Sequence, residues 1–160
     1  MHQTMTAVAD QYKLNTKLFD KVLEGVKDNQ QFTSPMEVAN SVNWVAGHLV
    51  SSRYGVANML GIEDKCPWGD MYDMGVDLKD SSEYPSLAEI KSAFKEISAK
   101  LESGLESAPE SALTKEPPWQ GPGMENSIRG TVAFMSFHES YHLGQLGYLR
   151  KLLGLDRAFG

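Results

Sequence analysis

The chain contains a single cysteine, Cys66, among its 160 residues. An intrachain disulfide is therefore impossible, and a reducing compartment is permitted. The sequence also lacks the run of about 20 apolar residues that a membrane-spanning helix requires. Asp10, Lys13 and Lys17 interrupt its N-terminal region, which has no apolar stretch of signal-peptide length. We therefore expect a cytoplasmic protein with no membrane partner.

Basic residues are scarce relative to acidic ones, with 15 Lys and Arg against 21 Asp and Glu, and the net charge is −6. Nucleic acids and anionic membranes attract basic patches, so we expect neither as a partner. Hydrophobic residues make up 41% of the chain, which is ordinary for a globular protein. Its length suits one domain, and we expect a single domain over residues 1–160.

Strand signals are weak, because no segment sustains an alternation of apolar and polar residues. Four segments have helical periodicity instead, at about 4–27, 34–60, 86–108 and 127–153. The second and third begin with the capping boxes Ser-Pro-Met-Glu at 34–37 and Ser-Leu-Ala-Glu at 86–89. The apolar residues expected to face the core in the first segment are Leu14, Leu18, Val22 and Val26.

Four amphipathic helices predict an all-α protein, a four-helix bundle. The connection at 62–85 has about 24 residues and spans more than 70 Å when extended, at roughly 3.3 Å per residue. A helix of about 26 residues is only about 40 Å long, so this connection can cross the whole bundle and leave helices 2 and 3 parallel. Glycine within a helix costs roughly 1 kcal/mol against alanine. Close packing within the bundle or across a dimer is therefore expected at Gly47, Gly55, Gly144 and Gly147.

Histidines are the candidate functional residues. His138 and His142 are four residues apart on the expected core face of the fourth helix, so their imidazoles lie one above the other. His48 flanks the apolar face of the second helix. Three imidazoles predict a mononuclear metal site with an open fourth position. The alternative is that these histidines are hydrogen-bonded core residues without a metal.

Two other motifs overlap the histidine pair. The sequence His-Glu-Ser-Tyr-His at 138–142 matches the metalloprotease pattern H-E-x-x-H. Only 18 residues follow, however, and Gln145 and Tyr148 occupy the positions where the extended pattern has Gly and His. The E-x-x-H pattern of di-iron bundles starts at Glu139, but the chain has no second copy.

Other candidates surround the three histidines. Glu139 is the nearest group for proton transfer or for orienting an imidazole, although a surface position is equally compatible with the sequence. Trp44, one turn before His48, and Gln145, one turn after His142, are the candidate substrate-binding residues. Trp44 could equally belong to the core, and Gln145 could simply bond a backbone group.

The segments Asn-Trp-Val-Ala-Gly-His-Leu at 43–49 and Phe-His-Glu-Ser-Tyr-His-Leu-Gly-Gln-Leu-Gly-Tyr-Leu-Arg at 137–150 resemble the DinB/YfiT-like superfamily of metal-dependent bundles. The resemblance extends over the whole chain and implies an up-down-down-up topology with the long crossover between helices 2 and 3. It also implies a homodimer and one divalent metal, nickel or zinc, on His48, His138 and His142.

Characterised members of that superfamily include S-transferases and isomerases that use low-molecular-weight thiols such as bacillithiol, mycothiol or glutathione. The resemblance thus implies a thiol-dependent transferase acting on a small electrophilic molecule, of the kind involved in detoxification. A metal-dependent hydrolase that activates water and a metal-binding bundle without turnover are the alternatives.

Overall fold

The computed structural model describes residues 5–36 and 40–158, and these residues form helices and connections without any strand. The long helices are α1 (Thr6–Leu23), α2 (Val42–Met59), α3 (Leu87–Ser107) and α5 (Ile128–Leu152). A one-turn helix and two 3₁₀ turns lie in the connections: α4 (Glu110–Leu113), η2 (Asp28–Gln30) and η3 (Ser81–Glu83). No helix within the described ranges is long and apolar enough to cross a membrane.

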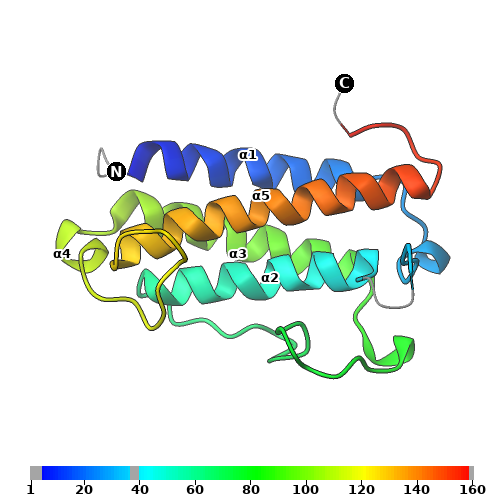
Figure 1. Ribbon diagram of the computed structural model, residues 1–160, viewed down its shortest axis with the longest axis horizontal. Helices are drawn as coiled ribbons and strands as arrows, with labels where there is room; N and C mark the ends of the chain where they lie inside the picture. The colour runs from blue at the N-terminus through cyan, green and yellow to red at the C-terminus, as the bar shows by residue number, and fades with distance from the viewer. Residues whose placement is uncertain (1–4, 37–39, 159–160) are drawn as a thin grey trace.

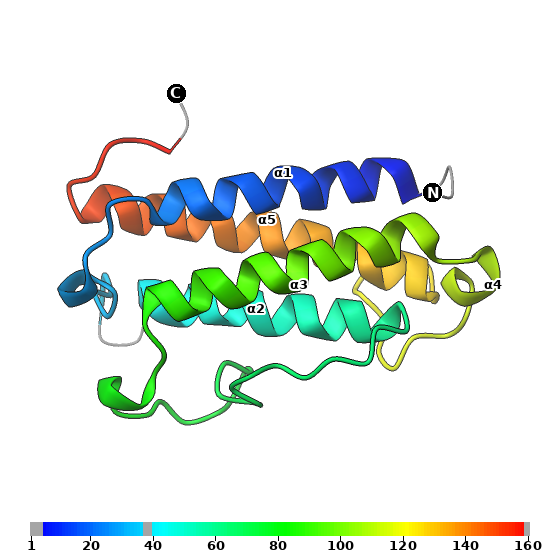
Figure 2. The same cartoon turned by 180° about the vertical axis from the view of Figure 1, so that it is seen from behind.

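The long helices form a four-helix bundle (Figure 1). Helices α1 and α5 run side by side in one direction, and α2 and α3 run together in the opposite direction (Figures 1 and 2). The connection between α2 and α3 travels back along the outside of α2 before α3 begins. The expected up-down-down-up topology with a long crossover is therefore confirmed.

The sequence signals at α3 are also confirmed. The hydroxyl of Ser86 accepts a hydrogen bond from the backbone N–H of Glu89, whose carboxylate accepts one from the backbone N–H of Ser86. This capping box satisfies backbone donors that the first helical turn leaves unpaired. The apolar face of α3 is entirely buried: Leu87, Ile90, Phe94, Ile97, Leu101 and Leu105.

The predicted start of the second helix is wrong. Helix α2 begins at Val42, where the hydroxyl of Ser41 accepts a hydrogen bond from the backbone N–H of Trp44. Ser34 lies outside any helix, directly before a bend at Pro35 and Met36, and its hydroxyl donates to the carbonyl of Met36. The remainder of the predicted first turn, 37–39, lies outside the described residues.

Long-range hydrogen bonds account for the later start. The side-chain amide of Asn43 donates to the Gln31 side chain and to the Pro85 carbonyl, each over 2.8 Å. The backbone N–H of Asn43 also donates to the Gln31 carbonyl, at 2.8 Å. These three hydrogen bonds attach the first turn of α2 to two distant connections. A capping pattern covers only residues three positions apart, so it does not predict them.

The expected core face of α1 is only partly correct. Val22 is buried, but Leu14 is 50% exposed, and the helix ends at Leu23 instead of residue 27. Residues four apart advance by about 400° around a helix of 3.6 residues per turn. The row therefore drifts by about 40° at each step, and Leu14, two steps before the buried Val22, falls outside the core.

Only one of the four helical glycines meets the expectation of close packing. A Cβ atom at Gly47 would lie 2.1 Å from the Tyr72 ring, so the side chain of a crossover residue occupies that space. Gly55, Gly144 and Gly147 have no atom within 4 Å of such a Cβ among the described residues. They leave open space on their helices, and the expectation of close packing within the bundle is wrong for them.

Candidate metal centre

The structure brings the three predicted histidines together between α2 and α5. The Nε2 atom of His138 lies 3.3 Å from Nε2 of His48 and 3.0 Å from Nε2 of His142. The candidate ligand atoms of the three side chains all lie within 4.8 Å of one another. His48 is buried, and the two histidines of α5 are half-buried.

The two separations from His138 Nε2 match those between ligands of a single metal ion. Two nitrogens bound tetrahedrally at about 2.0–2.1 Å from zinc are about 3.3 Å apart, and octahedral angles bring them to about 3.0 Å. The set offers three imidazole nitrogens, which suit zinc, nickel, copper and iron alike. Within the described part of the chain, no carboxylate or thiolate joins the cluster. The donor set therefore matches three ligands and leaves at least one coordination position open.

Hydrogen bonds on the outer side of the cluster fix two of the rings. His48 Nδ1 lies 2.8 Å from the Tyr72 carbonyl, and His142 Nδ1 lies 2.7 Å from Oε1 of Gln145. Both partners are acceptors, so each Nδ1 carries a proton and each Nε2 presents a lone pair to the centre. Nδ1 of His138 is buried without a hydrogen-bond partner among the described residues.

Burial lowers the pKa of all three histidines. For His138 the pKa falls to about 4, because burial and the neighbouring His142 and His48 rings disfavour the charged form. Burial also lowers the pKa of His48 and of His142, although their hydrogen bonds to Tyr72 and Gln145 partly oppose it. The imidazoles are thus neutral at pH 7, which is the form that binds a metal.

The crossover connection holds His48 in place. Tyr72 is fully buried, its ring covers Gly47, and its hydroxyl donates to the side-chain oxygen of Asn43 over 2.9 Å. Tyr72 thereby places its carbonyl at the Nδ1 atom of His48. Sequence reasoning missed this residue; the one available signal was a glycine inside a helix directly before a candidate ligand.

Trp44 stacks on the His48 ring, with 4.9 Å between ring centroids and 10° between planes. Trp44 therefore packs against the outer face of a candidate metal ligand, His48. It also lines a cavity of about 260 Å³ together with Asn43 and Tyr84. Gln145 reaches the site by its hydrogen bond to His142. Both predicted substrate-binding residues, Trp44 and Gln145, therefore contact the histidine cluster.

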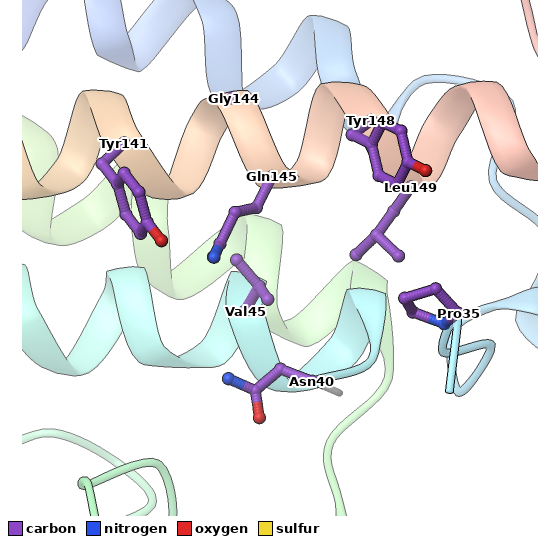
Figure 3. Close-up of a pocket in the computed structure, with 8 residues that line it drawn as sticks. All are labelled: Pro35, Asn40, Val45, Tyr141, Gly144, Gln145, Tyr148 and Leu149. Carbon is purple, nitrogen blue, oxygen red and sulfur yellow. The ribbon is translucent and has the colours of Figure 1, made fainter. Parts of the chain in front are cut away.

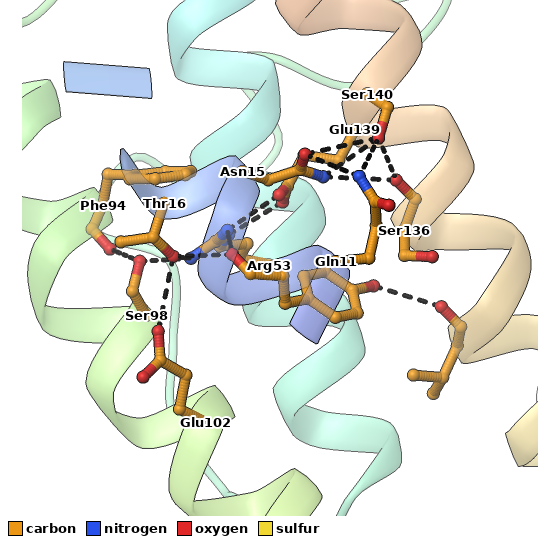
Figure 4. Close-up of polar contacts among 12 residues, drawn as sticks. Gln11, Asn15, Thr16, Arg53, Phe94, Ser98, Glu102, Ser136, Glu139 and Ser140 are labelled. Carbon is orange, nitrogen blue, oxygen red and sulfur yellow. Dashed lines mark hydrogen bonds and ion pairs between the residues drawn. The ribbon is translucent and has the colours of Figure 1, made fainter. Parts of the chain in front are cut away.

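Glu139 is buried, with 2% of its side chain exposed, so the surface position left open by the sequence is wrong. Each of its carboxylate oxygens accepts a hydrogen bond of 2.7 Å from the guanidinium of Arg53, which is itself fully buried (Figure 4). The other guanidinium hydrogen bonds go to the hydroxyls of Thr16 and Ser98 and to the carbonyl of Tyr12. The Arg53–Glu139 pair thus joins all four long helices beside His138.

Sequence reasoning also missed Arg53. A signal was present, because Arg53 lies four residues after Leu49 and three before Val56, on the apolar face of α2. A charged residue on a core face needs a buried partner. A carboxylate on another helix can neutralise its charge and accept its hydrogen bonds, and Glu139 does both.

A pocket of about 530 Å³ adjoins the histidines between α5 and the start of α2 (Figure 3). Its lining is Pro35, Asn40, Val45, Tyr141, Gly144, Gln145, Tyr148 and Leu149. Gln145 belongs both to the pocket and to the site, and the Tyr141 ring lies 5.3 Å from the His142 ring. The volume is within the range of small-molecule sites.

A model of the DinB superfamily matches residues 11–146, a range that includes all three histidines. The chain belongs to the DinB superfamily. A crystal structure of a DinB-like protein from Bacillus subtilis, YjoA, has the same fold, with a TM-score of 0.68 over 95% of each chain and 15% sequence identity. No curated protein matches the sequence. The DinB assignment and the histidine cluster together fit a metal-binding protein.

Proposed function

We propose that this DinB-superfamily protein binds one divalent metal, nickel or zinc, through Nε2 of His48, His138 and His142. We further propose that it is a metal-dependent enzyme that joins a low-molecular-weight thiol to a small electrophilic substrate. The observation that carries the proposal is the convergence of three neutral imidazole nitrogens beside a pocket. The open coordination position is typical of catalytic metal sites, since structural sites have four protein ligands.

The chain's own residues have distinct roles in this proposal. Tyr72 and Gln145 hold His48 and His142 in the tautomer that ligates through Nε2. A bound metal would supply the charge that keeps a coordinated thiol deprotonated, and the thiolate is the nucleophilic form. Trp44 and Tyr141 cover the ligand rings and restrict water at the site.

Glu139 has a different role from the one its sequence position suggests. Arg53 occupies both of its oxygens, so we propose Glu139 as a positioning residue that sets the orientation of α5 beside His138. A hydrolase that activates water and a metal-binding protein without turnover are the alternatives, and a homodimer remains a proposal.

Metal content tests the first half of the proposal. Untagged protein is analysed by mass spectrometry beside the triple variant His48→Ala, His138→Ala, His142→Ala. We expect about one divalent ion per chain in the natural protein and none in the variant. Absence of metal from the natural protein, even after incubation with nickel or zinc, would contradict the proposal.

Turnover tests the second half. Metal-loaded protein is incubated with bacillithiol, mycothiol or glutathione and the electrophile monobromobimane, and the thioether is quantified. We expect a rate above that of the triple variant incubated with the same metal and purified in the same way. A metal-bound protein with no excess rate for any of these thiols would favour the binding protein, and hydrolysis of a p-nitrophenyl ester without thiol would favour the hydrolase.

A further inference from the structure

Among the described residues, the lining of the pocket beside the histidines is uncharged. Figure 3 shows eight lining residues, all in the described part of the chain, and none of them is a lysine, arginine, histidine, aspartate or glutamate. Two tyrosine rings, Val45, Leu149 and Pro35 provide apolar surface, whereas Asn40 and Gln145 contribute carboxamides. None of these eight side chains offers an anion a cationic partner for the hydration that it would lose on entering the pocket, and that loss costs free energy.

Gln145 connects this pocket to the ligand His142, and its amide has two different ends. The oxygen Oε1 faces Nδ1 of His142 at 2.7 Å. Once Nε2 of His142 ligates a metal, Nδ1 carries a proton and needs an acceptor, so the oxygen of Gln145 is committed to it. The amide nitrogen therefore points elsewhere, and in Figure 3 it points away from α5 toward Val45. An –NH₂ group, which can only donate, is thus presented to the pocket.

We infer that this pocket binds the electrophilic substrate, and that the substrate is a neutral, largely apolar molecule bearing a hydrogen-bond acceptor such as a carbonyl oxygen. Gln145 donates to that acceptor and thereby places the substrate beside the histidine cluster. The inference rests on the proposed function, because the metal commits the oxygen of Gln145 to His142. It adds the class of substrate and the residue that selects it.

The variant Gln145→Glu separates the two roles of the residue. A carboxylate still accepts the hydrogen bond from His142 Nδ1, but it offers the pocket an acceptor and a negative charge instead of a donor. Metal content should therefore stay at the natural level. The matched control is Gln120→Glu, which adds the same charge on an exposed loop, where the side-chain amide donates a hydrogen bond to the Met124 carbonyl.

Two probes of nearly equal shape test the class of ligand: the neutral ketone 4-phenyl-2-butanone and the anion 3-phenylpropionate. Each is titrated into protein incubated with zinc while the side-chain ¹⁵NH₂ signal of Gln145 is followed by NMR, assigned by its absence from Gln145→Glu. We expect the ketone to shift this signal and to bind about tenfold tighter than the anion. Ketone affinity should fall about tenfold in Gln145→Glu, the effect of one lost hydrogen bond, and stay unchanged in Gln120→Glu.

Unchanged ketone affinity in Gln145→Glu would overturn the inference, and so would equal affinity for the two probes in the natural protein. Metal content, measured separately on the same preparations, distinguishes this failure from that of the proposed function. Metal without ketone selectivity leaves the metal centre standing and removes the substrate assignment. Ketone selectivity without bound metal leaves the substrate assignment standing and removes the metal centre.

Discussion

Folding lowers the pKa of His138, because its ring is buried beside two other imidazoles. Its pKa is about 4 in the folded chain, against an ordinary value of 6.5. The unfolded chain therefore takes up a proton first as the pH falls, and the free energy of unfolding decreases between about pH 6.5 and 4. Above pH 6.5 His138 is neutral in both the folded and the unfolded chain, and it does not lower the free energy of unfolding.

Urea denaturation of metal-free protein between pH 4 and 8 checks this prediction. We expect the midpoint to fall as the pH drops below about 6.5, and to fall less in His138→Asn, which lacks the titrating ring. Carboxylates titrate in the same range in both proteins, so the difference between the two curves is the quantity to measure. Parallel curves would refute the assignment to His138.

Gly47 is predicted to control the metal centre indirectly. In Gly47→Ala the new Cβ would lie 2.1 Å from the Tyr72 ring and displace it, together with the carbonyl bonded to His48. Loss of such a hydrogen bond behind a ligand lowers metal affinity by roughly 10- to 100-fold. Competition with a chromophoric chelator measures the affinity. Gly55→Ala is the matched control, because its Cβ meets no described atom and alanine favours the helix by about 1 kcal/mol.

At the scale of the helices, the Arg53–Glu139 pair is expected to dominate stability. In Arg53→Met the carboxylate of Glu139 remains buried without its cation, and breaking a buried pair in this way costs about 3–5 kcal/mol. Guanidinium denaturation measures the loss. The double variant Arg53→Met, Glu139→Leu removes both charges and should recover a large part of it. A double variant as unstable as the single one would mean that the polar contacts of Arg53, and not its charge, hold the helices together.

At the same scale, helix α3 was predictable and the beginning of α2 was not. The capping box at Ser86 joins residues three positions apart, so the local sequence contains all of its partners. An equivalent pattern at Ser34 was misleading, because Asn43 makes hydrogen bonds to Gln31 and Pro85 that begin the helix at Val42. Local patterns predict helix ends only where no distant partner competes.

For the whole molecule, metal binding is expected to clamp α2 against α5. A ligand that binds only the folded state at about 100 times its dissociation constant adds about 2.7 kcal/mol to the free energy of unfolding. For a chain of this size that raises the melting temperature by about 5–10 °C. Thermal denaturation of chelator-treated protein with and without nickel or zinc measures the shift. The triple histidine variant should show none, and an equal shift there would place the bound metal elsewhere.

The amino-acid sequence by itself determined the helical class and the placement of His138 and His142 on one helix face. These follow from periodicity and from the four-residue spacing of the two histidines, which are local properties of a helix. The length of the connection at 62–85 permitted helices 2 and 3 to be parallel, and the resemblance to the DinB/YfiT-like superfamily implied that arrangement and His48 as the third ligand. The tertiary structure alone decided which groups orient those histidines and which buried ion pair lies beside them. The bond from His48 to Tyr72 joins residues 24 apart, and the pair of Arg53 with Glu139 joins residues 86 apart. Partners at such separations are set by how the helices pack. The same packing buries these polar groups, and a buried polar group needs a hydrogen-bond or charge partner to offset its lost hydration.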